Sequence, residues 1–395
     1  MRISRLAFVS AAASSLAALS LAGIAGGVAA QETSDVGCEE RPGLIEWDGD
    51  AGTQAWSEPT NWAADAIPGP GSHVCIAVPA ATVVLDAGTA SIASLQVAPG
   101  SALVVTGNAV LELAGPEPST LAAVVLSNGT LSGAGTRTVT GSAVLDVGTL
   151  AGAGRTVIAP DARLQVGTGA GGTLTINGGH VLALEAGATG VWGPGPHDIA
   201  LEAPSRIENA GELVITNDRA LRGSGTLANT GTLRKLSHGT TSLAIAPEDG
   251  SWLVNEGTVE VVAGLLEVTG PGLDNRSIVS LGATPEAVGR ISAPAFSQTE
   301  TATYQVGLAG TTPHARSGSL TVSGPETSLA GALIVSPDSS FAVTAPQQLM
   351  LLATPAGAAS QSFDTVTGAD ALPGGATGEL LSLPEGVALA VEPGG

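Results

Sequence analysis

Residues that could bind a sugar or a cation gather near the start of this 395-residue chain. Three tryptophans there are interleaved with acids and followed closely by an asparagine. The set comprises Trp47, Asp48, Asp50, Trp56, Asn61 and Trp62. Indole faces stack on sugar rings, and carboxylates accept hydrogen bonds from sugar hydroxyls or bind calcium. A second interpretation, which we favour, is that the indoles close the end of a core while the acids flank turns.

Hydrolytic and metal chemistry has little support in the rest of the sequence. There is no Gly-x-Ser-x-Gly nucleophile elbow, and no two of the five histidines have a spacing that would place both on one metal ion. A polysaccharide-degrading enzyme would need carboxylates, often with arginines, on one face. The candidates are Asp146, Asp161, Glu185, Asp198 and Glu202, with Arg155, Arg163 and Arg206. Their spacing does not predict a catalytic pair, so we expect no catalysis and no cofactor other than calcium.

The elements that must position these residues are short strands in a repeating pattern. Two units without gaps, 129–147 and 148–166, share the heading Gly-Thr-Leu-x-Gly-Ala-Gly. A period near 20 residues with Gly and Thr turns matches one coil of a stacked β-solenoid. The alignment of the two units predicts that Leu145 stacks on Leu164. We therefore predict an all-β fold, a right-handed parallel β-solenoid (β-helix) with an N-terminal Trp-rich cap module and C-terminal capping coils.

A second repeated phrase, Asn-x-Gly followed by Glu or Thr and an aliphatic residue, begins at Asn209, Asn229 and Asn255. Asparagine tolerates turn conformations, and its amide can bond to the amide above and below it in a stack. We expect these three side chains to form a ladder along the turns. The alternative is that Asn-x-Gly is only a common turn sequence.

Composition and charge narrow the class of protein. Aromatic residues make up 3% of the chain, so Val, Leu, Ile and Ala must fill the interior, while 55 glycines and 24 prolines disfavour helical repeats. The net charge of −21 would repel nucleic acid and anionic membrane surfaces. We expect no nucleic-acid partner and no insertion of the mature chain into a membrane.

The N-terminus has the pattern of an export signal. Arg2 and Arg5 precede an apolar stretch that ends in small residues at 28–30, which predicts a cleaved signal peptide over 1–30. The only two cysteines, Cys38 and Cys75, would then meet oxidising conditions, and we predict a disulfide between them. The expected location is secreted, extracellular or at the cell surface.

The predicted organisation has four parts. The signal peptide (1–30) is followed by the Trp-rich, disulfide-containing cap module (31–79). Solenoid repeats (80–300) come next, and terminal β-coils with a cap (301–395) complete the chain.

Part of the sequence resembles a known group of proteins. The run Asp48-Gly-Asp-Ala-Gly, then Trp56, Asn61-Trp62 and Pro68-Gly-Pro-Gly, resembles the Trp-rich start of many bacterial exported β-helical proteins. The Asn-x-Gly-Thr-Val phrases and the stretch 310–335 are similar to passenger domains of autotransporter-like and filamentous surface proteins. The resemblance implies a surface-displayed coil architecture and specifies no chemistry. A translocator barrel pattern does not follow, which departs from the autotransporter arrangement.

These observations predict a secreted or cell-surface β-solenoid with an adhesive, scaffolding or glycan-contacting role and no catalysis. Its expected partner is a cell-surface glycan or a protein ligand. One alternative is a polysaccharide-degrading β-helix enzyme, a lyase or glycoside hydrolase, and another is the N-terminal portion of a larger surface protein. A groove lined by acids and arginines across several coils would favour the enzyme, whereas a smooth Thr, Ser and Asn surface would favour the structural protein.

Overall fold

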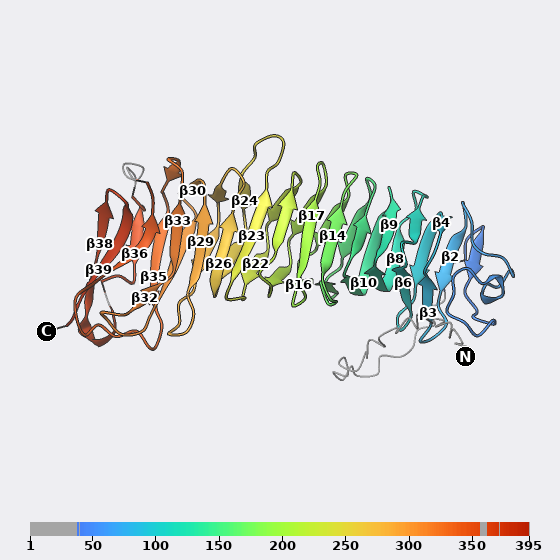
Figure 1. Cartoon of the computed structure of the whole chain (residues 1–395), viewed down its shortest axis with the longest axis horizontal. Helices are drawn as coiled ribbons and strands as arrows, with labels where there is room; N and C mark the ends of the chain where they lie inside the picture. Colours follow the sequence, from blue (N-terminus) through green and yellow to red (C-terminus); the bar gives the residue numbers. More distant parts are fainter. Residues whose placement is uncertain (1–37, 39, 356–361, 371, 395) are drawn as a thin grey trace, which may run out of the picture. The chain divides into compact units, whose positions relative to one another are not determined.

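The computed structural model describes residues 38, 40–355, 362–370 and 372–394. The predicted signal peptide lies outside these residues. The described chain consists of short β-strands joined by turns, with two three-residue 3-10 helices, η1 (Pro59–Asn61) and η2 (Pro373–Gly375). The strands stack as parallel coils of a β-solenoid (Figure 1), which confirms the predicted all-β solenoid class.

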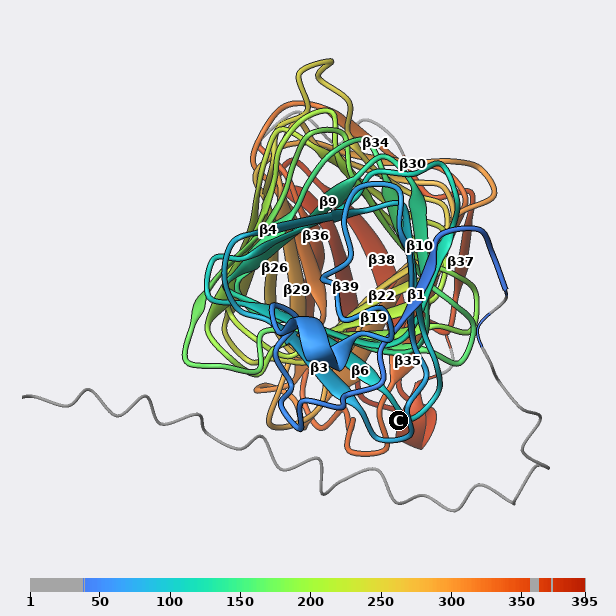
Figure 2. The same ribbon diagram turned by 90° about the vertical axis from the view of Figure 1, so that its right-hand side faces the viewer.

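Each coil contains up to three strands, which we assign to a first ladder, a second ladder and a 14-strand sheet. The first turn joins the first ladder to the second, the second turn leads to the 14-strand sheet, and the third turn begins the next coil. Seen at 90° to the first view, successive coils superimpose around a common interior (Figure 2).

The strands of the first ladder pair in parallel along the stack. They are β1 (Leu44–Glu46), β2 (His73–Ile76), β5 (Ser94–Val97), β8 (Ser119–Ser127), β10 (Thr136–Leu145), β12 (Arg155–Ile158), β15 (Val181–Leu184), β18 (Arg206–Asn209), β21 (Thr226–Asn229), β24 (Leu253–Asn255), β27 (Leu273–Asn275), β30 (Phe296–Gln298) and β34 (Thr327–Ser328).

The second ladder shares β8 and β10 with the first, because these longer strands run through the first turn and pair in both ladders. Its other strands are β3 (Thr82–Leu85), β6 (Ala102–Thr106), β13 (Arg163–Val166), β16 (Thr189–Trp192), β19 (Glu212–Ile215), β22 (Thr232–Lys235), β25 (Thr258–Val261), β28 (Ile278–Leu281), β31 (Thr303–Ala309), β35 (Ala332–Pro337) and β37 (Thr365–Thr367), with β32 (Arg316–Ser317) antiparallel to β31.

The 14-strand sheet begins at β4 and ends in an antiparallel hairpin. In spatial order its strands are β4 (Thr89–Ile92), β7 (Val110–Leu113), β9 (Gly129–Gly133), β11 (Gly148–Leu150), β14 (Gly172–Ile176), β17 (His197–Leu201), β20 (Ala220–Gly223), β23 (Thr240–Ile245), β26 (Gly264–Val268), β29 (Gly289–Ala293), β33 (Ser319–Val322), β36 (Gln347–Ala353), β39 (Gly386–Glu392) and β38 (Thr377–Leu383).

Inward-facing and outward-facing side chains alternate along each strand, and the inward-facing ones form the core. In β6, Leu103 and Val105 are buried while Val104 between them is half-buried and faces outward. Register then places Leu103 beside Val83 of β3 and Val124 of β8, so inward aliphatic side chains form continuous columns. Each such side chain contributes about 1.5–3 kcal/mol through burial. Aliphatic columns thus replace large aromatic residues over most of the interior.

The predicted stacking of Leu145 on Leu164 is wrong. Leu145 pairs with Val166, and Leu164 pairs with Ala143. The two coils keep the 19-residue register from Gly129 and Gly148 onward, but the first turn after β12 spans 159–162, whereas β10 passes the same corner with a bulge. The longer turn shifts the register of the following strand by two residues, which preserves the inward and outward faces because side chains alternate with period two.

Candidate functional site

The N-terminal tryptophans lie in the core. Trp62, Trp56 and Trp47 are 0%, 1% and 5% exposed. The Trp62 ring meets the other two edge to face, with centroids 5.0 Å from Trp47 and 4.8 Å from Trp56. Its Nε1 donates a hydrogen bond of 2.9 Å to the Trp56 carbonyl. This burial leaves no broad indole face for a sugar ring.

The polar members of the same cluster serve the local backbone. Asn61 is buried, and its Nδ2 donates to Thr53 Oγ1 (2.8 Å) and to the Ala55 carbonyl (3.1 Å). The Asp48 carboxylate accepts the Asp50 amide at 3.1 Å, as in an Asx turn. In the part of the chain that the structure describes, no three His, Cys, Asp or Glu residues form a group that could hold a metal ion.

The predicted disulfide is confirmed. Cys38 is bonded to Cys75 of β2, with their Cα atoms 6.0 Å apart. Because β2 pairs with β1 on one side and with β5 on the other, the bond ties the start of the described chain to the first coils.

The three predicted asparagines form a column of hydrogen-bonded amides at the ends of first-ladder strands. Asn209 Nδ2 donates to Asn229 Oδ1 and Asn229 Nδ2 to Asn255 Oδ1, both at 2.8 Å. The column continues through Asn275 (3.0 Å) to Gln298 (3.2 Å), and all five side chains are buried. Sequence reasoning missed these last two residues. Asn275 could have been found by its 20-residue spacing from Asn255, but it lacks the Asn-x-Gly phrase.

The candidate catalytic carboxylates do not converge. Asp161 and Glu185 lie in first turns, Asp146 in a second turn and Glu202 in a third turn. Thr168 Oγ1 donates to the Asp146 carboxylate at 2.6 Å, which stabilises the turn. The acids are therefore distributed over three corners of the coil.

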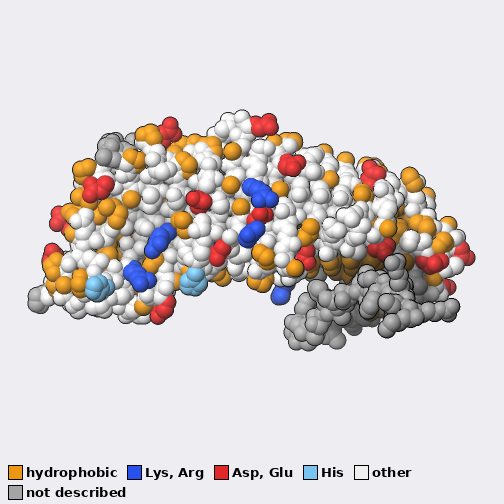
Figure 3. All heavy atoms as spheres, in the orientation of Figure 1, with side chains coloured by type: hydrophobic (Ala, Val, Ile, Leu, Met, Phe, Trp, Pro, Cys, Tyr) orange, Lys and Arg blue, Asp and Glu red, His pale blue; other side chains and the backbone are white. Residues whose placement is uncertain are grey.

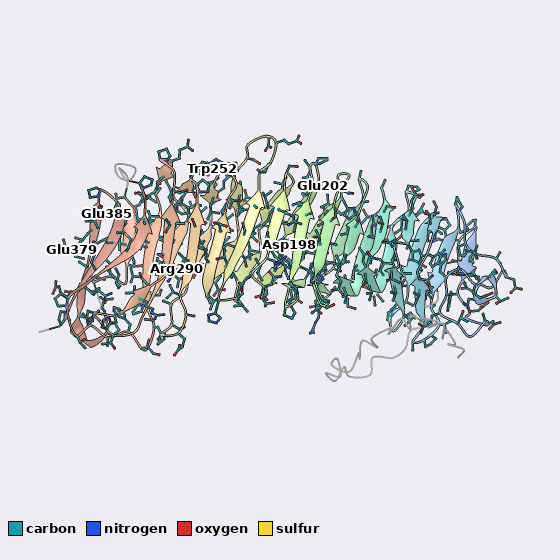
Figure 4. All side chains as sticks on the ribbon, in the orientation of Figure 1. Asp198, Glu202, Trp252, Arg290, Glu379 and Glu385 are labelled. Atoms are coloured by element: carbon teal, nitrogen blue, oxygen red, sulfur yellow. A yellow bond between two sulfur atoms is a disulfide. The ribbon has the colours of Figure 1, made fainter. Side chains whose placement is uncertain are left out.

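Of the three candidate arginines, Arg155 and Arg206 form ion pairs with a carboxylate, and Arg163 lies away from them. Arg155 Nη2 is 2.7 Å from Glu208 two coils further on, and Arg206 is 3.8 Å from the same carboxylate. Arg163 is exposed on β13. Asp198 of β17 (Figure 4), with a side chain 12% exposed, is held by Arg219 at 3.1 Å and Arg222 at 2.8 Å. These charges neutralise one another rather than face a common bond.

Two buried basic groups lie where third turns lead into first-ladder strands: His180 directly precedes β15, and Arg137 is the second residue of β10. His180 is fully buried, and its Nε2 is 2.9 Å from Thr156 Oγ1. Desolvation, together with the nearby Arg137 charge, lowers the pKa of His180 to about 3. Burial also lowers the pKa of Arg137 to about 10. His180 is therefore neutral at physiological pH, which avoids a second buried cation.

We expect acid to destabilise the protein through His180. The pKa of this residue rises on unfolding from about 3 towards 6.5, so between these values the unfolded state binds more protons and stability falls as the pH falls. From pH 7 to about 4.5 the loss from this group is roughly 2–3 kcal/mol. Urea titrations at several pH values should show this loss in the wild type and a smaller one in His180→Gln. An equal loss of unfolding free energy on acidification in the wild type and in His180→Gln would contradict this prediction.

The chain's single lysine is also buried. Lys235 Nζ donates to the Ser237 carbonyl at 2.8 Å and lies 3.5 Å from Asp218. Desolvation lowers the pKa of Lys235, and the Asp218 charge partly opposes this. The Ser237 hydroxyl itself donates to the Asn217 carbonyl at 2.8 Å. These interactions give the Lys235 ammonium group polar partners at the end of β22.

An aromatic residue that sequence reasoning missed lies beside a surface groove. Trp252 precedes β24 in a third turn (Figure 4), and its indole is half-buried. A Cβ atom at Gly272 would lie 3.0 Å from the indole Cδ2, so the absence of a side chain there allows the ring to lie against the next coil. The groove has a volume of about 320 Å³. Its polar lining includes Thr230, Ser251, Glu256 and Arg276.

The charged groups of this groove are fixed to one another. Arg276 Nε donates to Asp274 Oδ2 at 2.8 Å, and its Nη1 is 3.3 Å from Glu256 Oε1. These bonds raise the pKa of Arg276. Glu256 is the one carboxylic acid among the described lining residues, whereas glycoside hydrolysis uses two at a defined separation. An indole beside hydroxyls, a carboxylate and a guanidinium is a combination that can bind a sugar.

The wider surface agrees with the dispersed charges. Figure 3 shows acidic side chains scattered over the visible face, with basic side chains at a few places, two of them beside an acid near the middle of the stack. No family model matches the chain, and no curated protein matches it either.

Proposed function

We propose that this protein is an exported, non-catalytic β-solenoid that contacts glycans through the groove beside Trp252. The half-buried indole carries the proposal, because the three N-terminal indoles are in the core and Trp192 is 1% exposed. Aromatic faces bind the apolar faces of sugar rings, and the adjacent polar groups can accept or donate hydrogen bonds to hydroxyls.

Several observations support export to the cell surface or medium. The sequence begins with a signal-peptide pattern, and the disulfide suits an oxidising compartment. As a separate finding that does not bear on export, none of the helices in the described ranges has the length and hydropathy needed to cross a membrane. The solenoid fold agrees with the resemblance to bacterial exported β-helical surface proteins, in which such a stack would display a binding groove.

The proposal predicts a selective loss of binding on replacing Trp252. Trp252 also covers a small apolar cavity lined by Leu243, Ile245 and Val268, so leucine is the better replacement than alanine. Trp252→Leu should weaken binding to a glycan found on an array by at least about tenfold, or roughly 1.4 kcal/mol. Trp252→Phe should retain part of the affinity because it keeps an aromatic face. Calorimetry with the selected glycan measures both.

Leu236→Ala serves as a matched control, since Leu236 is an exposed apolar residue outside the groove. It should bind as the wild type does, and all three variants should remain folded at the temperature of the binding assay. Equal affinity of wild type and Trp252→Leu, or no glycan bound on the array, would contradict the proposal. Release of reducing ends or unsaturated sugars by the wild type would favour the polysaccharide-degrading alternative.

A further inference from the structure

The first strand of the 14-strand sheet, β4, has one edge without a strand partner among the described residues. β4 pairs with β7 and with no other strand among the described residues. The amides of Val110 and Ala114 donate to the carbonyls of Gly88 (2.9 Å) and Ile92 (2.8 Å), so these carbonyls face β7. Backbone groups alternate in direction along a strand. The amides and carbonyls of Thr89 and Ser91 therefore point away from β7, where they can accept another strand.

A groove follows this free edge. It has a volume of about 400 Å³, and its lining includes Trp56, Ile67, Pro68, Leu85, Thr89 and Ser91. Ile67 is 44% exposed, which is unusual for a large aliphatic residue in this chain. Pro68 and Pro70 also line the groove and have no N–H to donate. The segment 67–70 therefore borders the edge of β4 without pairing to it.

The charge around this edge is of one sign. Residues 42–136 contain no lysine or arginine, and their acids are Glu46, Asp48, Asp50, Glu58, Asp65, Asp86, Glu112 and Glu117. Three of these, Glu58, Asp65 and Asp86, lie within two residues of groove-lining positions. Negative potential on this scale attracts cationic partners and repels acidic ones.

We propose that the edge of β4 binds an extended, basic polypeptide by strand addition. Backbone hydrogen bonds would form to Thr89 and Ser91, an apolar side chain of the partner would fill the groove beside Ile67 and Trp56, and flanking Lys or Arg would face the acids. A second copy of this chain is disfavoured as the occupant. Its own exposed edge strand, β38 at the far end of the sheet, carries Glu379 and is followed by Glu385 (Figure 4).

Binding of synthetic peptides to the mature, disulfide-bonded protein tests this proposal. The probe is a fluorescent peptide of about eight residues, the length of a long strand, with alternating Val and Thr between terminal lysines. Control peptides replace the lysines by glutamates, or place proline at alternate positions. We expect saturable binding of the lysine peptide and no binding of either control peptide. With the lysine peptide bound, hydrogen exchange should show new protection at the amides of Thr89 and Ser91. Equal binding of the glutamate peptide, or binding without that protection, would overturn the proposal.

Two variants locate the site, and a third separates it from the Trp252 groove. Ser91→Pro removes an edge amide without disturbing the pairing with β7, and should weaken binding by up to about tenfold. Ile67→Lys, at an exposed position, should weaken it through charge repulsion even if Ser91→Pro does not fold. Trp252→Leu should leave peptide binding unchanged, so this result stands apart from glycan binding. Full affinity in Ile67→Lys would refute the site, and concentration-dependent self-association with protection of both β4 and β38 would assign the edge to a second copy instead.

Discussion

Replacing Trp62 by alanine is expected to lower the free energy of unfolding by about 3–5 kcal/mol, the range for emptying a large aromatic residue from a core. Trp62 is fully buried, contacts both Trp47 and Trp56 edge to face, and donates the hydrogen bond to the Trp56 carbonyl. Its loss removes the centre of the cluster. Urea unfolding followed by circular dichroism measures the change.

The effect of Trp62→Ala should begin at the N-terminal coils. In a stacked repeat each coil is stabilised mainly by its neighbours, so damage at one end exposes the next coil first. Hydrogen exchange should therefore quicken in β2 and β5 before it quickens in β26. Trp252→Leu provides a tryptophan control outside the cluster. A wild-type unfolding midpoint in Trp62→Ala would show that the cluster does not act as a cap.

Replacing Asn229 by leucine is expected to destabilise the protein by roughly 2–6 kcal/mol, since two buried polar groups would each lose a partner at about 1–3 kcal/mol. Asn229 accepts a hydrogen bond from Asn209 and donates one to Asn255. Leucine can do neither, although its volume is similar. Chemical denaturation gives the difference from wild type.

Asn209→Leu is the matched comparison at the end of the same column. Asn209 Oδ1 has no partner among the described residues, and the preceding coil presents Leu184 at this position. The substitution leaves Asn229 Oδ1 unpaired in place of Asn209 Oδ1, so the number of unpaired amide oxygens in the column does not change. The loss in free energy of unfolding should therefore be clearly smaller for Asn209→Leu than for Asn229→Leu. Equal destabilisation by the two variants would contradict a cooperative amide column.

Some parts of this structure could be predicted from local pattern because they depend on period and composition. The alternation in segments such as Ala102–Thr106 and the Gly-Thr-Leu repeat require half-buried strands in short coils. The disulfide followed from there being only two cysteines behind an export signal. These inferences needed no knowledge of which strands are neighbours.

Other features depend on the exact length of each turn, which sets what lies above and below a residue. The longer turn at 159–162 moved Leu164 from Leu145 to Ala143, although the flanking sequences align without a gap. Asn275 joins the amide column because its strand has the same register as that of Asn255, despite its different turn sequence.

The candidate sites show the same division between sequence and structure. The sequence by itself determined an acidic β-solenoid with a Trp-rich start, since composition, repeat period and residue spacing are properties of the chain alone. Only the tertiary structure decided that Trp62 is buried while Trp252 lines a groove with Arg276. It also decided that β4 pairs with a strand on one side only among the described residues. The physical reason is that exposure and pairing depend on contacts between coils some 20 or more residues apart, and the length of each intervening turn sets those contacts.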